Sequence, residues 1–542
     1  MRMYRLAAWW LVAAALVAAP AQAGRFEEFT KKAADAKPLK TLAATYFGGA
    51  DAEEFVAAGS QPDGTIVAFG NAWGPGFPAS PAPTVLGQGK RYDVPESTPD
   101  KKGNAVFDRA NPNAAGLIVR YSADLKKVVG VMRFDWGVAS IETGLVRPDG
   151  GLVIAGRCTE AFGAVAAQGF SNKLAAPAEE ATGKRKDSKF GPYAYQNVQL
   201  PGDVYVAGLA RDGGRILWAH ILVGHRQPPP RLFPDEKGGI VFEASGIKRI
   251  SPDGKVLASV AGPMGDGDRV KLLAVSTKDG TILHGGDRNT RTNREPWRQP
   301  FLNCLDAGGN RLWRIWDWDS KTVGSDAKHL ESDSAVRAAA FAPGGEIVVG
   351  GWSDGGNSIF TRKIKDLDAK FQAPGLGMSS WGMKGANSLA YVMRFDPKTF
   401  EFSAWTLWVS YVPTSPDGKG GNPNFCKIAR MEMLRDGSVF LCGQAATGLI
   451  ETPGAWFEYA ADARMGGHYV AIFSPDFTKL LFSSYVPACE VNGLGQAKAG
   501  LLIASRSIGK DDGGRSPPVV EALQKDFGGK LDGHLILFER PQ

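Results

Sequence analysis

The chain has 542 residues, of which 44% are hydrophobic and 22% are charged, so its composition is that of a globular protein and excludes a largely disordered chain. Its formal net charge of +7 is small for this length, and Lys and Arg form no stripe, which argues against a nucleic-acid-binding protein. The 68 glycines and 34 prolines gather between short apolar runs, a distribution that is typical of all-β proteins.

The first residues predict a secretory signal peptide over residues 1–23. Arg2 and Arg5 form a charged head, an apolar centre follows, and an A-x-A cleavage site ends at Ala23. The apolar centre is too short to span a bilayer, and no later stretch is long and apolar enough, so we expect no membrane span in the mature chain. The sequence therefore predicts a secreted or periplasmic protein.

Residues 24–38 are polar and helix-prone, and they predict a short N-terminal helix or arm. Residues 39–46, with the sequence LKTLAATY, have the pattern of the last strand of a repeated unit. The plainest copy of that unit covers residues 426–487, where four short apolar runs are joined in two hairpins. A fourth strand therefore precedes any first strand in the chain.

A tight turn between the first and second strands of the unit recurs seven times. The turns are at residues 62–64, 148–150, 234–239, 278–280, 343–345, 435–437 and 498–500. Each precedes a strand that is apolar on consecutive positions, such as TIVAFG or GLVIAG, which requires a sheet covered on both faces. The count of these turns predicts seven blades.

The second hairpin of the unit occurs six times, and the last apolar run, residues 533–539, has no strand after it. The missing strand at the end and the unpaired strand at the start have the same role, so we expect the two to pair and close a ring. The predicted fold is all-β: a seven-bladed β-propeller of four-stranded antiparallel blades over residues 39–542.

Long inserts follow the second strand of several blades, and the largest cover residues 71–115, 157–202, 352–388 and 506–532. In an up-and-down sheet, the loops after strands two and four leave at the same end. We therefore expect the inserts to share one face of the disc, the long-loop face, and to hold any binding site there or at the adjacent channel mouth.

The stretch TYFGGADAEEFVAAGSQPDGTIVAFGNAWGPGFP, residues 45–78, resembles the repeat of the bacterial SBBP-type seven-bladed β-propeller family, with its Y-x-G-G, P-D-G and F-P elements. The stretches TGLIETPGAW and GGHYVAIFSPDFTKLLFSSY are similar to the second half of that repeat. Three other blades match it only in strand pattern. The resemblance implies an exported propeller and implies no catalytic residues.

Five cysteines in an exported chain leave at least one thiol unpaired. Cys158, Cys304 and Cys442 lie in or beside strands, and we expect them to be buried free thiols. Cys426 and Cys489 lie near loops that enter adjacent blades, and two hypotheses remain for them, a disulfide or two free thiols.

The six histidines show no metal-ligand spacing, so we expect no zinc site. Acidic pairs occur in consecutive inter-blade loops, at Asp266 and Asp268 and at Asp317 and Asp319. Clustered carboxylates are the ligands that Ca²⁺ prefers, which makes calcium a candidate cofactor, with solvated loop carboxylates as the alternative.

Aromatic residues in or beside the long-face loops are candidate ligand-binding residues, because aromatic platforms suit sugars and peptides; the alternative is that they form the small cores of the inserts. The candidates are Trp73, Trp136, Trp352, Trp381 and Trp456. The runs GGRILW and GGNRLW are similar to the tryptophan-docking motif of quinoprotein propellers, but the rest of that motif is absent.

These features predict an exported, non-enzymatic binding or scaffold protein that uses the long-loop face to bind a protein, peptide or glycan. The alternative is an extracytoplasmic propeller enzyme, such as a polysaccharide lyase, a glycosidase or a quinoprotein, with its site at the channel mouth. A glycosidase would need two carboxylates facing each other across a cleft.

Overall fold

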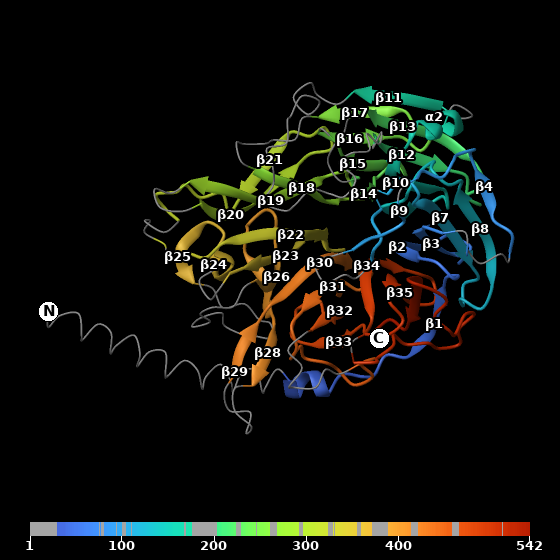
Figure 1. Cartoon of the computed structure of the whole chain (residues 1–542). Coiled ribbons are helices and arrows are strands. Elements are labelled where there is room, and N and C mark those ends of the chain that lie inside the picture. Colours follow the sequence, from blue (N-terminus) through green and yellow to red (C-terminus); the bar gives the residue numbers. More distant parts are fainter. Residues whose placement is uncertain are drawn as a thin grey trace.

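The computed structural model describes residues 30–74, 76, 81–93, 95–99, 105–109, 111–166, 170–175, 203–223, 229–244, 246–260, 268–291, 296–323, 329, 331–354, 359–370, 388–413, 421–457, 466–511 and 513–541. Seven antiparallel sheets stand side by side in a ring, which confirms the predicted seven-bladed β-propeller (Figure 1). The chain passes from the centre of each sheet to its outer edge, and then enters the next sheet.

The first four blades use residues 53–315. From the centre outwards, blade one has β2 (Glu53–Ser60), β3 (Ile66–Ala72), β7 (Ala115–Tyr121) and β8 (Val128–Phe134). Blade two has β9 (Thr143–Val146), β10 (Leu152–Cys158), β12 (Asp203–Leu209) and β13 (Ile216–Val223). Blade three has β14 (Leu232–Pro234), β15 (Ile240–Glu243), β16 (Ile247–Ile250) and β17 (Val256–Val260). Blade four has β18 (Asp268–Val275), β19 (Ile282–Arg291), β20 (Pro296–Leu305) and β21 (Arg311–Ile315).

The last three blades complete the ring. Blade five has β22 (Ser334–Phe341), β23 (Ile347–Ser353), β26 (Leu389–Phe395) and β27 (Phe402–Trp408). Blade six has β30 (Cys426–Met433), β31 (Val439–Ala445), β32 (Gly467–Phe473) and β33 (Leu480–Tyr485). Blade seven has β34 (Cys489–Gln496), β35 (Leu501–Ser507), β36 (Asp532–Phe538) and, as its outermost strand, β1 (Thr41–Phe47).

Blade seven is therefore made from both ends of the chain, as the strand pattern predicts. β1 pairs antiparallel with β36, from Thr41 opposite Phe538 to Phe47 opposite Gly533. The insert of the same blade covers the free side of β1, because Ala44 and Val520 exchange backbone hydrogen bonds of 2.7 and 3.1 Å. This pairing leaves no open sheet edge at the junction of the two termini.

Blades one and two differ from the prediction of four strands, because each has a fifth. β4 (Thr84–Leu86) runs parallel to β8, and β11 (Phe170–Ala175) runs parallel to β13. Both added strands come from the long insert between the second and third strands of their blade. The insert returns along the outer edge and uses hydrogen-bonding groups that a four-stranded blade leaves free.

The tight turns between first and second strands depend on glycine. Six of the seven turns contain a glycine with φ between 72° and 93°, a region that other residues seldom adopt. The six are Gly64, Gly150, Gly238, Gly280, Gly345 and Gly437. The backbone conformation of these turns explains why the sequence repeats a glycine at each of these places.

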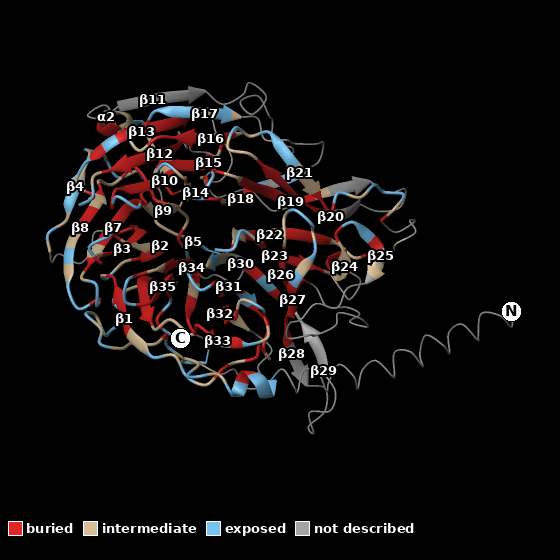
Figure 2. Ribbon diagram, turned by 180° about the vertical axis from the view of Figure 1, so that it is seen from behind, coloured by how far each residue is buried: buried red, intermediate tan, exposed pale blue. Residues whose placement is uncertain are grey.

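The core lies between the blades. The second and third strands are buried on both faces, whereas outer strands such as β17 and β21 have exposed residues (Figure 2). Between blades six and seven, for example, Phe440 and Cys442 pack with Leu501, Ile503 and Phe538. Each blade thus covers the apolar face of its neighbour, which a single blade is unable to do for itself.

Other elements belong to the inserts: helix α2 (Glu160–Ala166), the 3₁₀ turn η1 (Ile359–Thr361), and the hairpins β5 (Thr98–Pro99) with β6 (Ala105–Val106) and β24 (Arg362–Lys363) with β25 (Asp366–Lys370). A further hairpin, β28 (Ser410–Pro413) with β29 (Gly421–Asn424), lies in the connection between blades five and six. In the part of the chain that the structure describes, no helix has the length and apolar character needed to cross a membrane.

Candidate functional site

The innermost strands of the seven blades surround a cavity of about 1370 Å³ in the centre of the ring. Its walls are the C-terminal parts of these strands, and its rim includes the tight turns at Ser276, Lys278 and Gly345. The cavity thus opens at the tight-turn end of the channel, which is the end opposite to the long-loop face. The sequence-based hypothesis placed the site at the long-loop face instead.

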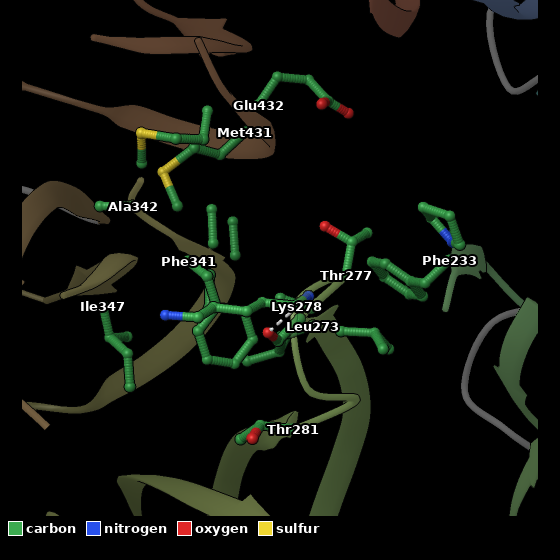
Figure 3. Close-up of a pocket in the computed structure, with 18 of the residues that line it drawn as sticks. Phe233, Leu273, Thr277, Lys278, Thr281, Phe341, Ala342, Ile347, Met431 and Glu432 are labelled. Carbon is green, nitrogen blue, oxygen red and sulfur yellow. Dashed lines mark hydrogen bonds between the residues drawn. The ribbon is translucent and has the colours of Figure 1, made fainter. Parts of the chain in front are cut away.

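Four blades contribute large apolar side chains to the cavity wall. Phe233 comes from β14, Leu273 from β18, Phe341 from β22 and Met431 from β30, and Figure 3 shows them around one common space. Leu273 is buried, and the other three are half-buried because one side faces the cavity. Such walls suit a ligand with an apolar body.

Charged side chains also line the cavity. Arg231, just before β14 of blade three, reaches across the channel to blade six, where its Nη2 donates to the carbonyl oxygen of Ala429 at 3.0 Å. Arg430 and Glu432 lie on β30 beside that contact. Within the described residues, no hydrogen bond or ion pair engages the side chain of Arg430 or of Glu432.

The enclosure of these groups changes their proton affinities. Burial, together with the neighbouring Arg430, lowers the pKa of Arg231 to about 10. Burial raises the pKa of Glu432 to about 7, although the two arginines act in the opposite direction. The Glu432 side chain is exposed, so it faces the open space of the cavity and not the packed core.

At the long-loop end, an ion pair of the first blade is also hydrogen-bonded to the last blade. The fully buried Glu54 carboxylate of β2 accepts hydrogen bonds from Arg109 Nε at 2.6 Å, Arg109 Nη2 at 2.8 Å and Asn71 Nδ2 at 2.9 Å. Arg109 belongs to the insert of blade one and also donates to Asn492 of β34 at 3.2 Å. Burial alone would raise the pKa of Glu54, but Arg109 overrides this effect and holds it below its usual value.

Through these contacts, Arg109 holds part of the blade-one insert against the first and last blades at the long-loop end, whereas the other end has only short turns. An insert long enough to bind a ligand is also long enough to fold over its own blade. Sequence length alone does not distinguish the two outcomes.

None of the four described aromatic candidates lines the cavity. Trp73 is completely buried and packs with Phe107 in the small core of the blade-one insert, which was the alternative interpretation of these residues. Trp352 is 6% exposed, with Arg298 and Arg337 over its ring at 5.8 and 5.7 Å. Neither side chain offers an open face to a ligand.

Two further candidates are half-buried, and the fifth is not described. Trp136 lies under the guanidinium of Arg133, which is 4.5 Å from the ring centroid. Trp456 packs against Phe538 and donates from Nε1 to Thr41 Oγ1 at 2.7 Å, so it fastens β1 to blade six. Trp381 lies outside the described residues.

The candidate calcium ligands already have protein partners where they are described. Asp317 forms ion pairs with Arg288 at 2.8 Å and with Arg314 at 2.6 Å. Asp319 accepts hydrogen bonds from the backbone N–H groups of Lys321 and Thr322, both at 2.9 Å. Asp266 and the side chain of Asp268 lie outside the described part. Among the described residues, no three His, Cys, Asp or Glu side chains are grouped so that they could hold a metal ion.

All five cysteines are free and buried, as predicted for Cys158, Cys304 and Cys442. The hypothetical disulfide between Cys426 and Cys489 is not formed in the structure. Cys426 packs in the cluster between blades five and six, whereas Cys489 packs in the cluster between blades six and seven. Burial raises the pKa of both thiols to about 12, so both stay protonated at neutral pH.

The charged residues of the cavity are not among the site residues predicted from the sequence, although the sequence carries a signal for them. The strand sequence CKIARMEML carries Lys427, Arg430 and Glu432, whereas the second strands of the blades are almost entirely apolar. Charges in a first strand are expected where that strand faces the channel. They mark the cavity wall more directly than tryptophans in the inserts do.

No family model matches the chain, and no curated protein matches it. Among solved structures, a protein of unknown function from Dyadobacter fermentans DSM 18053 is 12% identical, with a TM-score of 0.38 over 92% of this chain and 99% of that one. The β-propeller domain of the Trilobed protease from Pyrococcus furiosus, whose title reports an open velcro topology, is 7% identical, with a TM-score of 0.36 over 84% and 90% of the two chains. The strand order and the pairing of β1 with β36, rather than these likenesses, assign the seven-bladed β-propeller fold to this chain.

Proposed function

We propose that this chain is a non-enzymatic binding protein whose ligand enters the central channel at the tight-turn end. The cavity itself is the observation that carries this proposal. Apolar side chains from four blades surround a space of about 1370 Å³, and the Arg430 and Glu432 side chains, which have no hydrogen-bond or ion-pair partner among the described residues, also line it. A concave wall that combines apolar side chains with convergent polar groups can hold a small molecule.

A variant that narrows the mouth of the cavity tests the proposal. Thr277 lies in the turn after β18, lines the cavity and is exposed, so Thr277→Trp should obstruct the entrance without disturbing the core (Figure 3). A panel of small organic acids, amines, amides, sugars and short peptides is scored by the rise in melting temperature that a bound ligand causes. We expect a compound that stabilises the wild type and no longer stabilises Thr277→Trp.

The matched control is Leu257→Trp, which places the same side chain on the outer strand β17, where Leu257 is 50% exposed. The compound should raise the melting temperature of this control as much as it raises that of the wild type. A compound that stabilises all three proteins equally binds elsewhere, and such a result would reject the channel as the binding site.

Export is part of the proposal and is supported by the charged head, the apolar centre and the A-x-A site that ends at Ala23. The proposed membership of the SBBP-type propellers, which is supported by residues 45–78, agrees with a secreted or periplasmic location. Protein recovered from outside the cytoplasm should begin at Gly24 on N-terminal sequencing. A sequence that begins at Met1 would contradict the assignment of a signal peptide.

One observation favours a second candidate, an enzyme with its site in the same cavity. Burial brings the pKa of Glu432 to about 7, which suits a general acid or base near neutral pH. Glu432→Gln separates the two functions. If the protein is an enzyme, the wild type converts a ligand found by the panel, and Glu432→Gln still binds that ligand but no longer converts it. If the protein is a binding protein, the wild type converts none of the ligands found by the panel.

A further inference from the structure

Arg430 lines the cavity, and its side chain has N–H donors that bind no described residue. A guanidinium has five N–H donors and keeps its charge at physiological pH. No described residue forms a hydrogen bond or ion pair with this side chain, although burial depresses its pKa. Because an enclosed and unpaired charge costs free energy, a site of this kind gains from an anion that supplies the missing partner.

The groups around Arg430 leave an excess of positive charge. Arg231 from blade three is a second cation at the same depth, and Lys271 on β18 is a third, whose pKa is lowered by burial and then by Arg231. On β30 itself, Glu432 is the carboxyl that offsets the two arginines. From β31, Cys442 adds no charge, because burial raises the pKa of its thiol to about 12.

Other charges that influence these groups are already paired. Glu243 on β15 accepts from the backbone of Leu272 and contacts His284 at 2.8 Å, and Asp287 on β19 pairs with Arg269 at 2.6 Å. Arg109, which also depresses the pKa of Arg430, is bound to Glu54. The unpaired charge at the cavity floor is thus mainly that of Arg430, supported by Arg231.

We propose that the ligand is an organic anion, with an oxyanion group that binds Arg430 and Arg231 and an apolar body that lies against Phe233, Phe341 and Met431. This inference rests on the proposed function and adds the chemical class of the ligand. A guanidinium matches the oxygens of a carboxylate or a phosphate in a two-point contact, which sets the depth and orientation of the anion. The apolar wall then selects against small inorganic anions.

Glu432 makes this binding depend on pH. When its carboxyl is ionised, it repels the incoming anion and competes for the arginines, and when it is protonated, it does neither. Because the pKa of Glu432 is about 7, a carboxylate, whose own charge does not change over this range, should bind more tightly at about pH 6 than at about pH 8. Binding of the anion takes up a proton over this range.

Four probes on the full-length protein test the inference by calorimetry. Phenylbutyrate and phenethyl phosphate carry the two oxyanion groups on similar apolar bodies, phenylbutyramide removes the charge, and inorganic phosphate removes the body. We expect at least one of the two organic anions to bind about tenfold or more tightly than both the amide and inorganic phosphate. The organic anion that binds more tightly shows whether the site prefers a carboxylate or a phosphate.

Variants on β30 provide the second arm. Arg430→Gln should lower the affinity for the anion about tenfold or more, and Arg430→Lys should lower it less. Neither variant should change the weak binding of the amide. Glu432→Gln should abolish the difference between about pH 6 and pH 8. Since Arg430 has no partner among the described residues, both Arg430 variants should melt at or above the wild-type temperature, which excludes unfolding as the cause.

The inference fails if the amide binds as tightly as the anions, if Arg430→Gln binds the anion like the wild type, or if neither anion binds at about 10 mM. In each of these cases, any panel compound whose binding is blocked by Thr277→Trp keeps the proposed function intact. Failure of that blocking test rejects the proposed function, and the inference with it.

Discussion

Deletion of residues 39–46 should lower the melting temperature of the protein by roughly 5 to 10 °C and should cause concentration-dependent association. The deletion removes nearly all of β1, which pairs with β36 over its length and buries Ala43, Ala44 and Tyr46. It also removes the partner of the blade-seven insert, since Thr45 Oγ1 accepts a hydrogen bond from the backbone of Gln524 at 3.0 Å. The exposed edge of β36 is then free to pair with another chain.

Deletion of residues 24–37 is the matched control, because it shortens the same terminus by a greater length. In the described part of that segment, residues 30–37, Ala33 is buried against blade six, and most of the other side chains are exposed. We expect a small loss of stability and no association. Equal melting of the two truncated proteins, close to the wild type, would show that β1 contributes nothing to ring closure.

The second large effect is expected at Glu54. Glu54→Ala should destabilise the protein by about 3–5 kcal/mol, because it leaves the enclosed Arg109 without the carboxylate that pairs with it. The guanidinium donates to this completely buried carboxylate at 2.6 and 2.8 Å, and it also donates to the neutral side chain of Asn492 at 3.2 Å. Thermal unfolding near neutral pH measures the loss.

Glu53, the preceding residue on β2, is the control, because its pKa moves in the opposite direction. Burial raises the pKa of Glu53 from 4.5 to about 8, and Asp532 and Asp51 add to the shift. The folded state therefore holds a proton that the unfolded state releases, and stability falls as pH rises from about 4.5 to about 8. Glu53→Gln should change little near pH 5 and should stabilise the protein by a few kcal/mol near pH 9.

The contribution of Glu54 to the stability of the protein depends on pH in the opposite direction. Its folded pKa lies below the unfolded value, so its stabilisation is present at neutral pH and is lost as pH falls through the folded pKa. The stability difference between the wild type and Glu54→Ala should accordingly shrink in acid. A difference that is constant from acid to neutral pH would show that the ion pair with Arg109 is not its source.

The architecture could be predicted from sequence because it depends on local signals. A glycine with positive φ recurs in the turn between the first and second strands of six of the seven blades, and a strand at the start of the chain is matched by a missing strand at its end. Each signal lies within about ten residues and has a direct backbone cause. The fifth strands of blades one and two had no such signal, because the short segment 84–86 shows no strand pattern of its own.

The cavity could not be predicted in the same way, because its walls come from seven separate strands. The contact of Arg231 with Ala429 joins positions that are 198 residues apart, and nothing in either local sequence indicates the other. Trp73 shows the converse problem. A large aromatic residue in a long loop has the same sequence pattern whether it binds a ligand or packs in the core of its own loop, as it does here.

The shared seventh blade also determines the order in which the molecule can be completed. Lys40, just before β1, donates to Glu539, which lies 499 positions further along the chain. At about 5–20 residues per second, a ribosome needs about 25–100 seconds to make the sequence between them. For all of this time, blades one to six can form from finished hairpins, but β1 has no partner. A cell that makes this protein must therefore keep one strand from pairing with other chains until the last residues have been synthesised.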